Sequence, residues 1–210
     1  MIKIIVADDH PLLRAGLVQT INKEVDMKVH AEAGSGEELL SKVSDENFDV
    51  AILDIELPGR NGIETLMELR SQGSKLPVII LSAKSEERFG VRAIQAGANS
   101  YISKEDHKTN LVDAIRKVKG GKKFITAKLS EILAENIDSS SSKPLHENLS
   151  NRELEVMHHI ALGKPVSEIA ETLSLSINTV NTYRARILEK LRLENNTQIA
   201  IYALQNNLLD

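Results

Sequence analysis

The chain has 210 residues, of which 41% are hydrophobic and 27% are charged, and its formal net charge is −4. The length favours two domains, because single domains usually have about 100 to 150 residues. The absence of cysteine excludes a disulfide framework, a thiolate zinc site and a cysteine nucleophile, and it favours the cytoplasm. The acidic balance means that any nucleic-acid contact has to come from a local basic patch.

The start of the sequence does not have the pattern of a targeting segment. The apolar run Ile2–Ala7 is short for a signal peptide, and two acidic residues follow it at once. The sequence also has no stretch of about 18 apolar residues. We therefore expect no membrane partner.

The first 120 residues alternate five short apolar runs with amphipathic stretches. This alternation predicts an α/β domain with a parallel sheet covered by helices on both faces. The predicted strands are Ile2–Ala7, Lys28–Ala33, Val50–Leu53, Val78–Leu81 and Ser100–Ile102. The predicted helices lie near residues 12–25, 36–45, 62–71, 86–96 and 106–119. We expect a five-stranded, doubly wound sheet of the flavodoxin-like kind, whose ligand site lies at the carboxyl ends of the strands.

Two further segments follow this domain. Residues 121–146 contain a weakly amphipathic stretch and then four serines at 139–142, and serine runs bury little apolar surface, so we predict a linker. Residues 147–210 have no strand pattern. Four helical patterns near residues 150–162, 165–173, 177–191 and 196–207 predict a small all-α domain instead.

Acidic residues follow the first and third predicted strands. Asp8 and Asp9 come after the first strand, and Asp54 comes after the third. Strands one and three are neighbours at the switch point of such a sheet, so these carboxylates should share one pocket. Crowded carboxylates call for a cation, and oxygen ligands suit Mg²⁺.

The other two strand ends carry groups that suit a phosphoryl group. Ser82 follows the fourth strand with a hydroxyl, and Lys104 follows the fifth with an ammonium. Each residue alone has an ordinary explanation: a strand-end aspartate is usually a turn former, Ser82 a helix cap and Lys104 a solvated lysine. The combination of acid pair, acid, hydroxyl and ammonium at four strand ends is much more specific than any one of them.

Residues 1–120 resemble the receiver domain of two-component response regulators. The resemblance is carried by Val6–Pro11, Leu53–Gly62, Leu81–Ala83 and Ala96–Lys104. It implies that Asp54 is the phosphoacceptor and that a sensor histidine kinase is the donor. It also implies a Mg²⁺ site whose protein ligands are Asp8, acting through water, Asp9, Asp54 and the main-chain carbonyl of Glu56.

The same resemblance assigns roles around the phosphoryl group. Ser82 and Lys104 would hold its oxygens and be pulled inward, and Tyr101 would be the aromatic residue that swings to report phosphorylation. A partly buried strand aromatic is an equally good interpretation of Tyr101. The sequence departs from many receivers at Glu105, where those have proline, so the conformation of the peptide bond after Lys104 stays open.

The C-terminal domain has the pattern of a helix-turn-helix. Ser150 and Glu153 have capping-box spacing, and helical patterns at 165–173 and 177–191 are joined by a tight turn, so the second of these helices would enter the major groove. Its exposed face should contact DNA, since asparagine reads adenine, arginine reads guanine or holds phosphate, and threonine touches the thymine methyl. The predicted contact residues are Asn178, Asn181, Thr182, Tyr183, Arg184, Ala185, Arg186, Lys190 and Arg192.

Residues 147–208 resemble the LuxR-type DNA-binding domain. The shared segments are Leu149–Val156, Glu168–Ala170, Leu175–Ser176, Thr179–Val180 and Ile187–Leu191. With the receiver, this layout resembles the NarL/FixJ family, and the Thr-Tyr pair is similar to regulators of the BvgA and EvgA type. The resemblance implies binding to double-stranded promoter DNA as a homodimer, and it allows a contact with RNA polymerase.

The resemblance has departures, and two other functions are open. Ser167 and Asn181 stand where basic residues are common and Tyr183 where histidine is common, which predicts a shallower salt dependence of DNA binding. A phosphohydrolase would need a second aspartate where the chain has Glu56, and an interaction-only receiver would not shift promoter fragments. We expect no enzymatic activity beyond the receiver's part in its own phosphoryl transfer and dephosphorylation.

Overall fold

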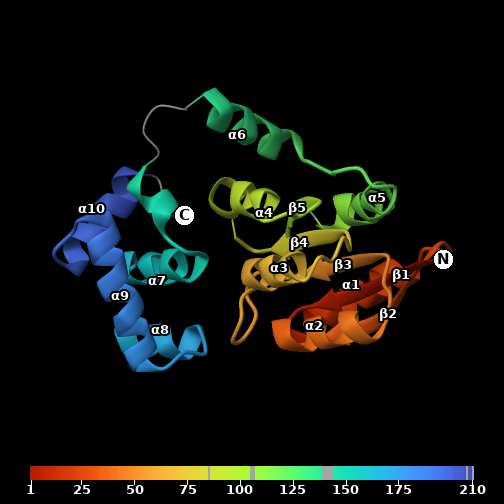
Figure 1. Cartoon of the computed structure of the whole chain (residues 1–210), viewed down its shortest axis with the longest axis horizontal. Helices are drawn as coiled ribbons and strands as arrows, with labels where there is room; N and C mark the ends of the chain where they lie inside the picture. The colour runs from red at the N-terminus through yellow and green to blue at the C-terminus, as the bar shows by residue number, and fades with distance from the viewer. Residues whose placement is uncertain (85, 105–106, 139–143, 207, 210) are drawn as a thin grey trace. The chain divides into compact units, whose positions relative to one another are not determined.

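The protein divides into two compact units, Met1–Asn136 and Ile137–Asp210. The computed structural model describes residues 1–84, 86–104, 107–138, 144–206 and 208–209 (Figure 1). Within this described part, no helix is both long and apolar enough to span a bilayer.

The first unit is built on a parallel sheet of five strands in the order β2-β1-β3-β4-β5 within its described residues (Figure 1). This order confirms the predicted flavodoxin-like sheet, in which β1 and β3 are neighbours. Each strand lies within one residue of its predicted bounds. The strands are β1 (Ile2–Ala7), β2 (Met27–Ala33), β3 (Val50–Leu53), β4 (Val78–Ser82) and β5 (Ser100–Ser103).

Helices cover both faces of this sheet, as crossovers between parallel strands require. Side chains of α1 and α5 join the core beneath one face, where Leu17, Ile21, Leu111 and Ile115 pack with alternate residues of the strands. The helices are α1 (Pro11–Asn22), α2 (Gly36–Asp45), α3 (Gly62–Ser71), α4 (Val91–Gln95) and α5 (His107–Lys119). The helix expected near 86–96 is divided into a π-helical turn, Glu86–Gly90, and the short α4.

The loop from β3 to α3 is packed so closely that it positions the end of β3. Asn61 caps α3 in a reciprocal capping box with Glu64, which satisfies two main-chain N–H groups at the helix start. A Cβ atom at Gly62 would lie 1.9 Å from the carbonyl oxygen of Asp54. Only glycine therefore fits there, and the loop is held against the residue that follows β3.

Part of the predicted linker is helical, and all but the last two residues of this helix belong to the first unit. Helix α6 spans Ala127–Asp138, and its Leu129 side chain is fully buried. The Thr126 hydroxyl donates to Glu86 Oε2 at 3.0 Å, and the Phe124 N–H donates to the Asn99 carbonyl at 3.0 Å. The boundary between the compact units follows residue 136, inside the range 121–146 that the serine run led us to assign to a linker. The serines at 139–142 lie outside the described residues.

In its described residues, the second unit consists of helices joined by turns and loops, with no strand. Helices α8 and α9 form the predicted helix-turn-helix, and the turn between them contains Ser174 with a φ of 52°. Ile169 and Ala170 of α8 are buried with Val180, Ile187 and Leu191 of α9, which confirms the predicted apolar face. The elements are a 3-10 turn (Leu145–Asn148), α7 (Asn151–Ala161), α8 (Val166–Thr172), α9 (Ile177–Leu191) and α10 (Asn196–Gln205).

Candidate functional site

Four strand ends meet in one pocket of the first unit. Asp8 follows β1 and Asp54 follows β3, and the last residues of these strands, Ala7 and Leu53, are paired in the sheet. Ser82 ends β4 and pairs with Ser103 at the end of β5, next to Lys104. Asp8 and Asp54 are each 1% exposed. The topology thus brings together two carboxylates, a hydroxyl and an ammonium that are distant in the sequence.

Lys104 bridges the two buried carboxylates. Its Nζ lies 2.6 Å from Asp54 Oδ2 and 2.9 Å from Asp8 Oδ2. One ammonium provides one positive charge, whereas two ionised carboxylates carry two negative charges. Buried charges need a compensating partner, so the described pocket is short of one positive charge when both aspartates are ionised.

The protonation of Asp54 reflects this deficit. The pKa of Asp54 is raised to about 7, because burial raises it by more than Lys104 lowers it, and the nearby charge of Asp8 adds to the increase. Among the described residues, Asp54 Oδ1 is buried without a hydrogen-bond partner. A divalent cation would satisfy this oxygen and favour the ionised form. The donor set therefore fits Mg²⁺.

Asp9 and His10 extend the acidic cluster toward solvent. Ligand atoms of Asp8, Asp9, His10 and Asp54 all lie within 4.8 Å of one another. His10 Nδ1 lies 2.6 Å from Asp9 Oδ1, and the His10 N–H donates to Asp8 Oδ1 at 2.7 Å. His10 was missed by the sequence reasoning, although its position directly after the acid pair was a signal that could have found it.

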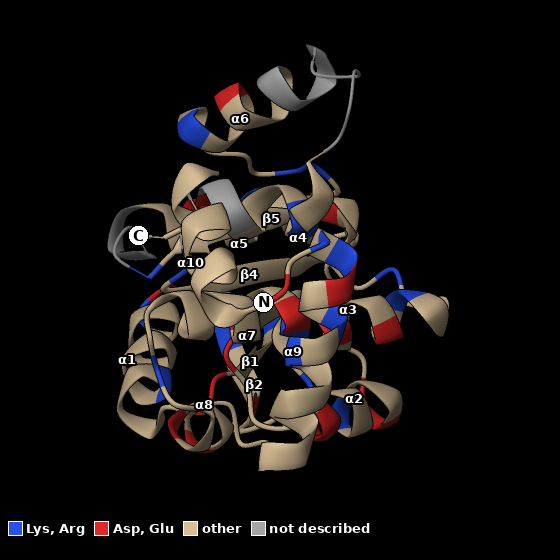
Figure 2. Ribbon diagram, turned by 90° about the vertical axis from the view of Figure 1, so that its left-hand side faces the viewer, with Lys and Arg blue, Asp and Glu red and all other residues tan. Residues whose placement is uncertain are grey.

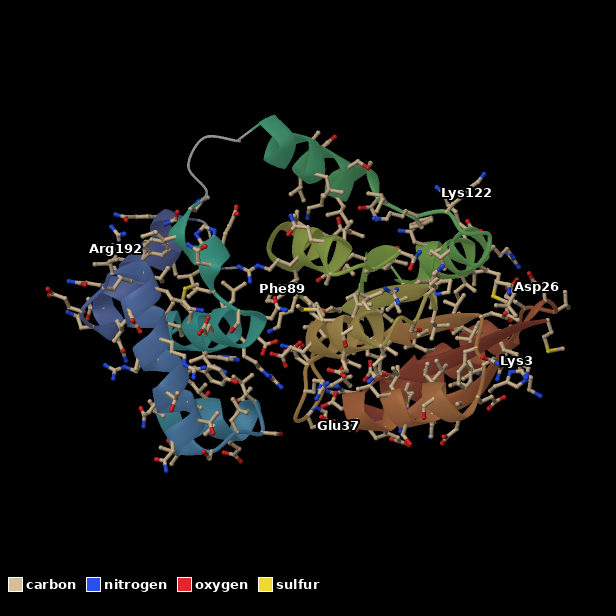
Figure 3. All side chains as sticks on the ribbon, viewed as in Figure 1. Lys3, Asp26, Glu37, Phe89, Lys122 and Arg192 are labelled. Atoms are coloured by element: carbon tan, nitrogen blue, oxygen red, sulfur yellow. The ribbon has the colours of Figure 1, made fainter. Side chains whose placement is uncertain are left out.

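The predicted DNA-contact face lies on α9 and at its end in the second unit, where Figure 2 colours the basic residues blue. Asn178, Asn181, Thr182, Ala185 and Arg186 are exposed. Tyr183 and Arg184 are half-buried, and exposed Arg192, labelled in Figure 3, ends the helix in the left-handed region with a φ of 58°. The apolar side of α9 is buried in the unit, and most of the predicted contact residues lie on the opposite, exposed side of the helix.

Both units match known protein families. Residues 4–116 match the response regulator receiver domain, and residues 147–203 match the bacterial regulatory proteins of the luxR family. The response regulator GacA of Pseudomonas aeruginosa is 32% identical over 211 residues, which cover 100% of this chain and 99% of GacA. UvrY of Escherichia coli K12 is 32% identical, covering 99% of this chain and 96% of UvrY. The chain belongs to the NarL/FixJ family of response regulators.

A solved structure of the same layout includes DNA. RcsB from Salmonella enterica serovar Typhimurium, bound to the promoter P1flhDC in the presence of the phosphomimetic BeF3⁻, matches with a TM-score of 0.61 and 25% identity. The match covers 96% of this chain and 97% of RcsB. This response regulator thus has a receiver domain and a LuxR-type domain, and it regulates transcription by binding DNA.

Beside the pocket of this response regulator, Lys84 links three residues. Its N–H donates to Ser82 Oγ at 3.1 Å, and its carbonyl accepts a 2.6 Å hydrogen bond from the Tyr101 hydroxyl. Its Nζ lies 3.0 Å from Glu56 Oε1. Sequence reasoning missed Lys84, because a lysine two residues after a strand is usually an ordinary surface residue.

Tyr101 is fully buried rather than partly buried. Burial raises the pKa of its hydroxyl above the usual range, so the hydroxyl stays protonated as a donor. Its contact with Lys84 ties it to the segment after β4. Glu105, where the conformation of the peptide bond was in question, lies outside the described residues.

Two of the predicted DNA contacts have partners inside the second unit. Lys190 Nζ lies 2.7 Å from Glu153 Oε2 and 3.2 Å from the Asn148 carbonyl. Arg184 Nε donates to Asn196 Oδ1 at 2.6 Å. These cations help to join α9 to its neighbours, so a role in DNA binding would require them to exchange or share these partners.

Proposed function

We propose that Asp54 is the phosphoacceptor of this response regulator and that its phosphorylation by a sensor histidine kinase controls binding to promoter DNA. The observation that carries this proposal is the contact of Lys104 with buried Asp54 at 2.6 Å, beside an acidic cluster and the Ser82 hydroxyl. A buried carboxylate beside a cation is positioned for phosphoryl transfer, in which positioning and charge supply most of the catalysis.

The side chains of the pocket have distinct roles in this proposal. A carboxylate oxygen of Asp54 attacks the phosphorus of the phosphohistidine and forms an acyl phosphate on Asp54. The P–N bond breaks, and the kinase histidine is the leaving group. Lys104 and Ser82 bind the phosphoryl oxygens by charge and by hydrogen bond. Asp8, Asp9, Asp54 and the Glu56 carbonyl would hold Mg²⁺, which supplies positive charge that stabilises the transferring phosphoryl group.

The signal would leave the pocket through β4 and β5. A phosphoryl group adds about −1.5 to −2 of charge at neutral pH, and Ser82 and Lys104 would move toward it. Since Lys84 contacts Ser82, Glu56 and Tyr101, this movement would reach the buried tyrosine. Such a change biases an element that has two arrangements, and we propose Tyr101 as that element.

On the DNA side, we propose that the exposed face of α9 reads the major groove as part of a homodimer. A symmetric dimer would protect two half-sites separated by about one helical turn or a multiple of it. The promoter target would place the protein in the cytoplasm, with RNA polymerase as a further predicted partner. We propose no enzymatic activity other than the receiver's part in its own phosphorylation and dephosphorylation.

Replacement of the acceptor tests the proposal. In Asp54→Asn, labelling by acetyl phosphate or by a phosphorylated kinase domain should fall to background, because an amide cannot form the acyl phosphate. Asp45→Asn is the matched control, since Asp45 is exposed at the end of α2, and it should label like the wild type. Undiminished labelling of Asp54→Asn would reject the assignment.

A further inference from the structure

The metal pocket has a nitrogen donor beside its oxygen donors. His10 stands directly after the acid pair, and its imidazole is within 4.8 Å of ligand oxygens of Asp8, Asp9 and Asp54. Mg²⁺ rarely coordinates imidazole nitrogen, because it prefers oxygen ligands and keeps several waters. The imidazole is therefore a feature of the pocket that magnesium binding does not explain.

The main chain holds His10 in place. Pro11 begins α1, and the residue before a proline favours an extended conformation, which His10 adopts with φ −93° and ψ 103°. Its N–H also donates to Asp8 Oδ1 at 2.7 Å. The side chain itself is 66% exposed, so it can turn toward an ion without disturbing the core.

The cluster also contains a buried carboxylate oxygen that could bind a metal ion. Asp54 Oδ1 is buried and has no hydrogen-bond partner within the described part of the chain. Two ligands that bind one zinc ion at about 2.0 to 2.2 Å lie at most about 4.4 Å apart, and the ligand atoms of this cluster all lie within 4.8 Å of one another. The cluster therefore brings oxygen and nitrogen ligands close enough together for a single ion.

We infer that this pocket also binds a late first-row transition ion, Zn²⁺ in particular, with His10 as its nitrogen ligand beside Asp9 and Asp54. Imidazole suits zinc, copper and nickel, and affinity for these ions exceeds affinity for earlier divalent ions at the same donors. The inference rests on the metal site of the proposed function. It adds that Zn²⁺ competes there with Mg²⁺ and so opposes the phosphorylation that Mg²⁺ supports.

Calorimetric titration of the full-length chain tests this inference. Zn²⁺ and Mg²⁺ are titrated separately, and Zn²⁺ is titrated again in excess Mg²⁺ to identify the heat that belongs to the pocket. The variants are His10→Gln, which removes the imidazole, Asp54→Asn, which removes the charge of the buried ligand, and His30→Gln, a control at an exposed histidine on β2. Visible absorption of bound Co²⁺ reports nitrogen coordination independently of any activity.

We expect His10→Gln to weaken Mg²⁺-sensitive Zn²⁺ binding at least about tenfold, since even outer-shell groups have effects of that size. Its Mg²⁺ affinity should change by less than about twofold, because Mg²⁺ relies on oxygen ligands. The Co²⁺ spectrum should change in His10→Gln and stay unchanged in His30→Gln.

The outcomes separate this inference from the proposed function. If Mg²⁺ binds in an Asp54-dependent way but Zn²⁺ binds His10→Gln as tightly as wild type, the inference is wrong and the magnesium site stands. If neither ion depends on Asp54, the magnesium site of the proposed function is wrong as well, and the inference is overturned with it.

Discussion

The pocket of the receiver domain and the exposed face of α9 are assembled in opposite ways. In the pocket, Lys104 contacts a carboxylate that is 50 residues away in the sequence, and that carboxylate is buried. On α9, the exposed residues come from one continuous helix of 15 residues, and helical periodicity alone places them together. A site built from distant, buried charges should be tightly coupled to stability, whereas an exposed helical face should be free to change.

The largest expected effect comes from removing the ammonium of Lys104, which contacts both Asp8 and Asp54. Lys104→Met leaves Asp8 and Asp54 buried without their ammonium, and breaking a buried ion pair from one side costs about 3 to 5 kcal/mol. We expect urea denaturation in Mg²⁺-free buffer to show a loss of this size, and added Mg²⁺ to restore part of it.

The control for Lys104→Met is Lys3→Met, which breaks a 3.5 Å ion pair with Glu46 in which both side chains are 48% exposed. That change should cost less than about 1 kcal/mol. Equal effects of the two substitutions would contradict the idea that burial makes the pocket sensitive.

On α9, the expected effect is on recognition rather than on stability. Asn181→Ala should alter base preference by about 1 to 3 kcal/mol at one position of the site and change the free energy of unfolding by no more than about 0.5 kcal/mol. Arg192→Ala should weaken binding to every sequence alike and reduce the salt slope by about one. Binding to a set of single-base operator variants at several salt concentrations measures both.

The two α9 variants serve as controls for each other. If Asn181→Ala and Arg192→Ala reduce affinity equally for all operator variants, the assignment of a base contact to Asn181 is wrong. A large loss of stability in either variant would place that residue in the core of the domain instead of on its recognition face.

The smallest expected effect is on stability and concerns the ion pair of Lys190 with Glu153. This pair has features of both sites, because Lys190 lies on α9 but contacts a buried carboxylate. Burial acts to raise the pKa of Glu153, but the hydrogen bonds from Lys190 and the Ser150 N–H outweigh it and lower the pKa below its usual value. A lowered pKa means that the ionised pair stabilises the folded state at neutral pH, and that this contribution is lost as the pH falls through the folded pKa.

Glu153→Gln should therefore cost about 1 kcal/mol at pH 7, and the difference from wild type should shrink as the pH approaches 3. Denaturant unfolding of both proteins across this range measures it. A difference that is constant with pH would show that the charge of Glu153 contributes nothing, and that only its capping hydrogen bond matters.

Local patterns were enough to predict most of the fold. The bounds of β1, β3, α2, α3 and α9 agree with the predicted ranges, because alternation, capping residues and glycines act over a few residues. Helix α6 was not predicted as part of the receiver, since its docking depends on Leu129 meeting the distant π-helical turn near Gly90. A weak amphipathic pattern cannot reveal which surface it will cover.

For the candidate pocket too, some features could be predicted from the sequence and others depended on the tertiary structure. The residue types at the strand ends, and the parallel sheet that would bring them together, follow from the order of apolar runs and acidic residues in the chain. The tertiary structure decided that Lys104 bridges Asp8 and Asp54, that Lys84 joins Ser82 to Tyr101, and that His10 lies within reach of the acidic cluster. Periodicity is a property of neighbouring residues, whereas the distance between two charges depends on how every intervening element packs.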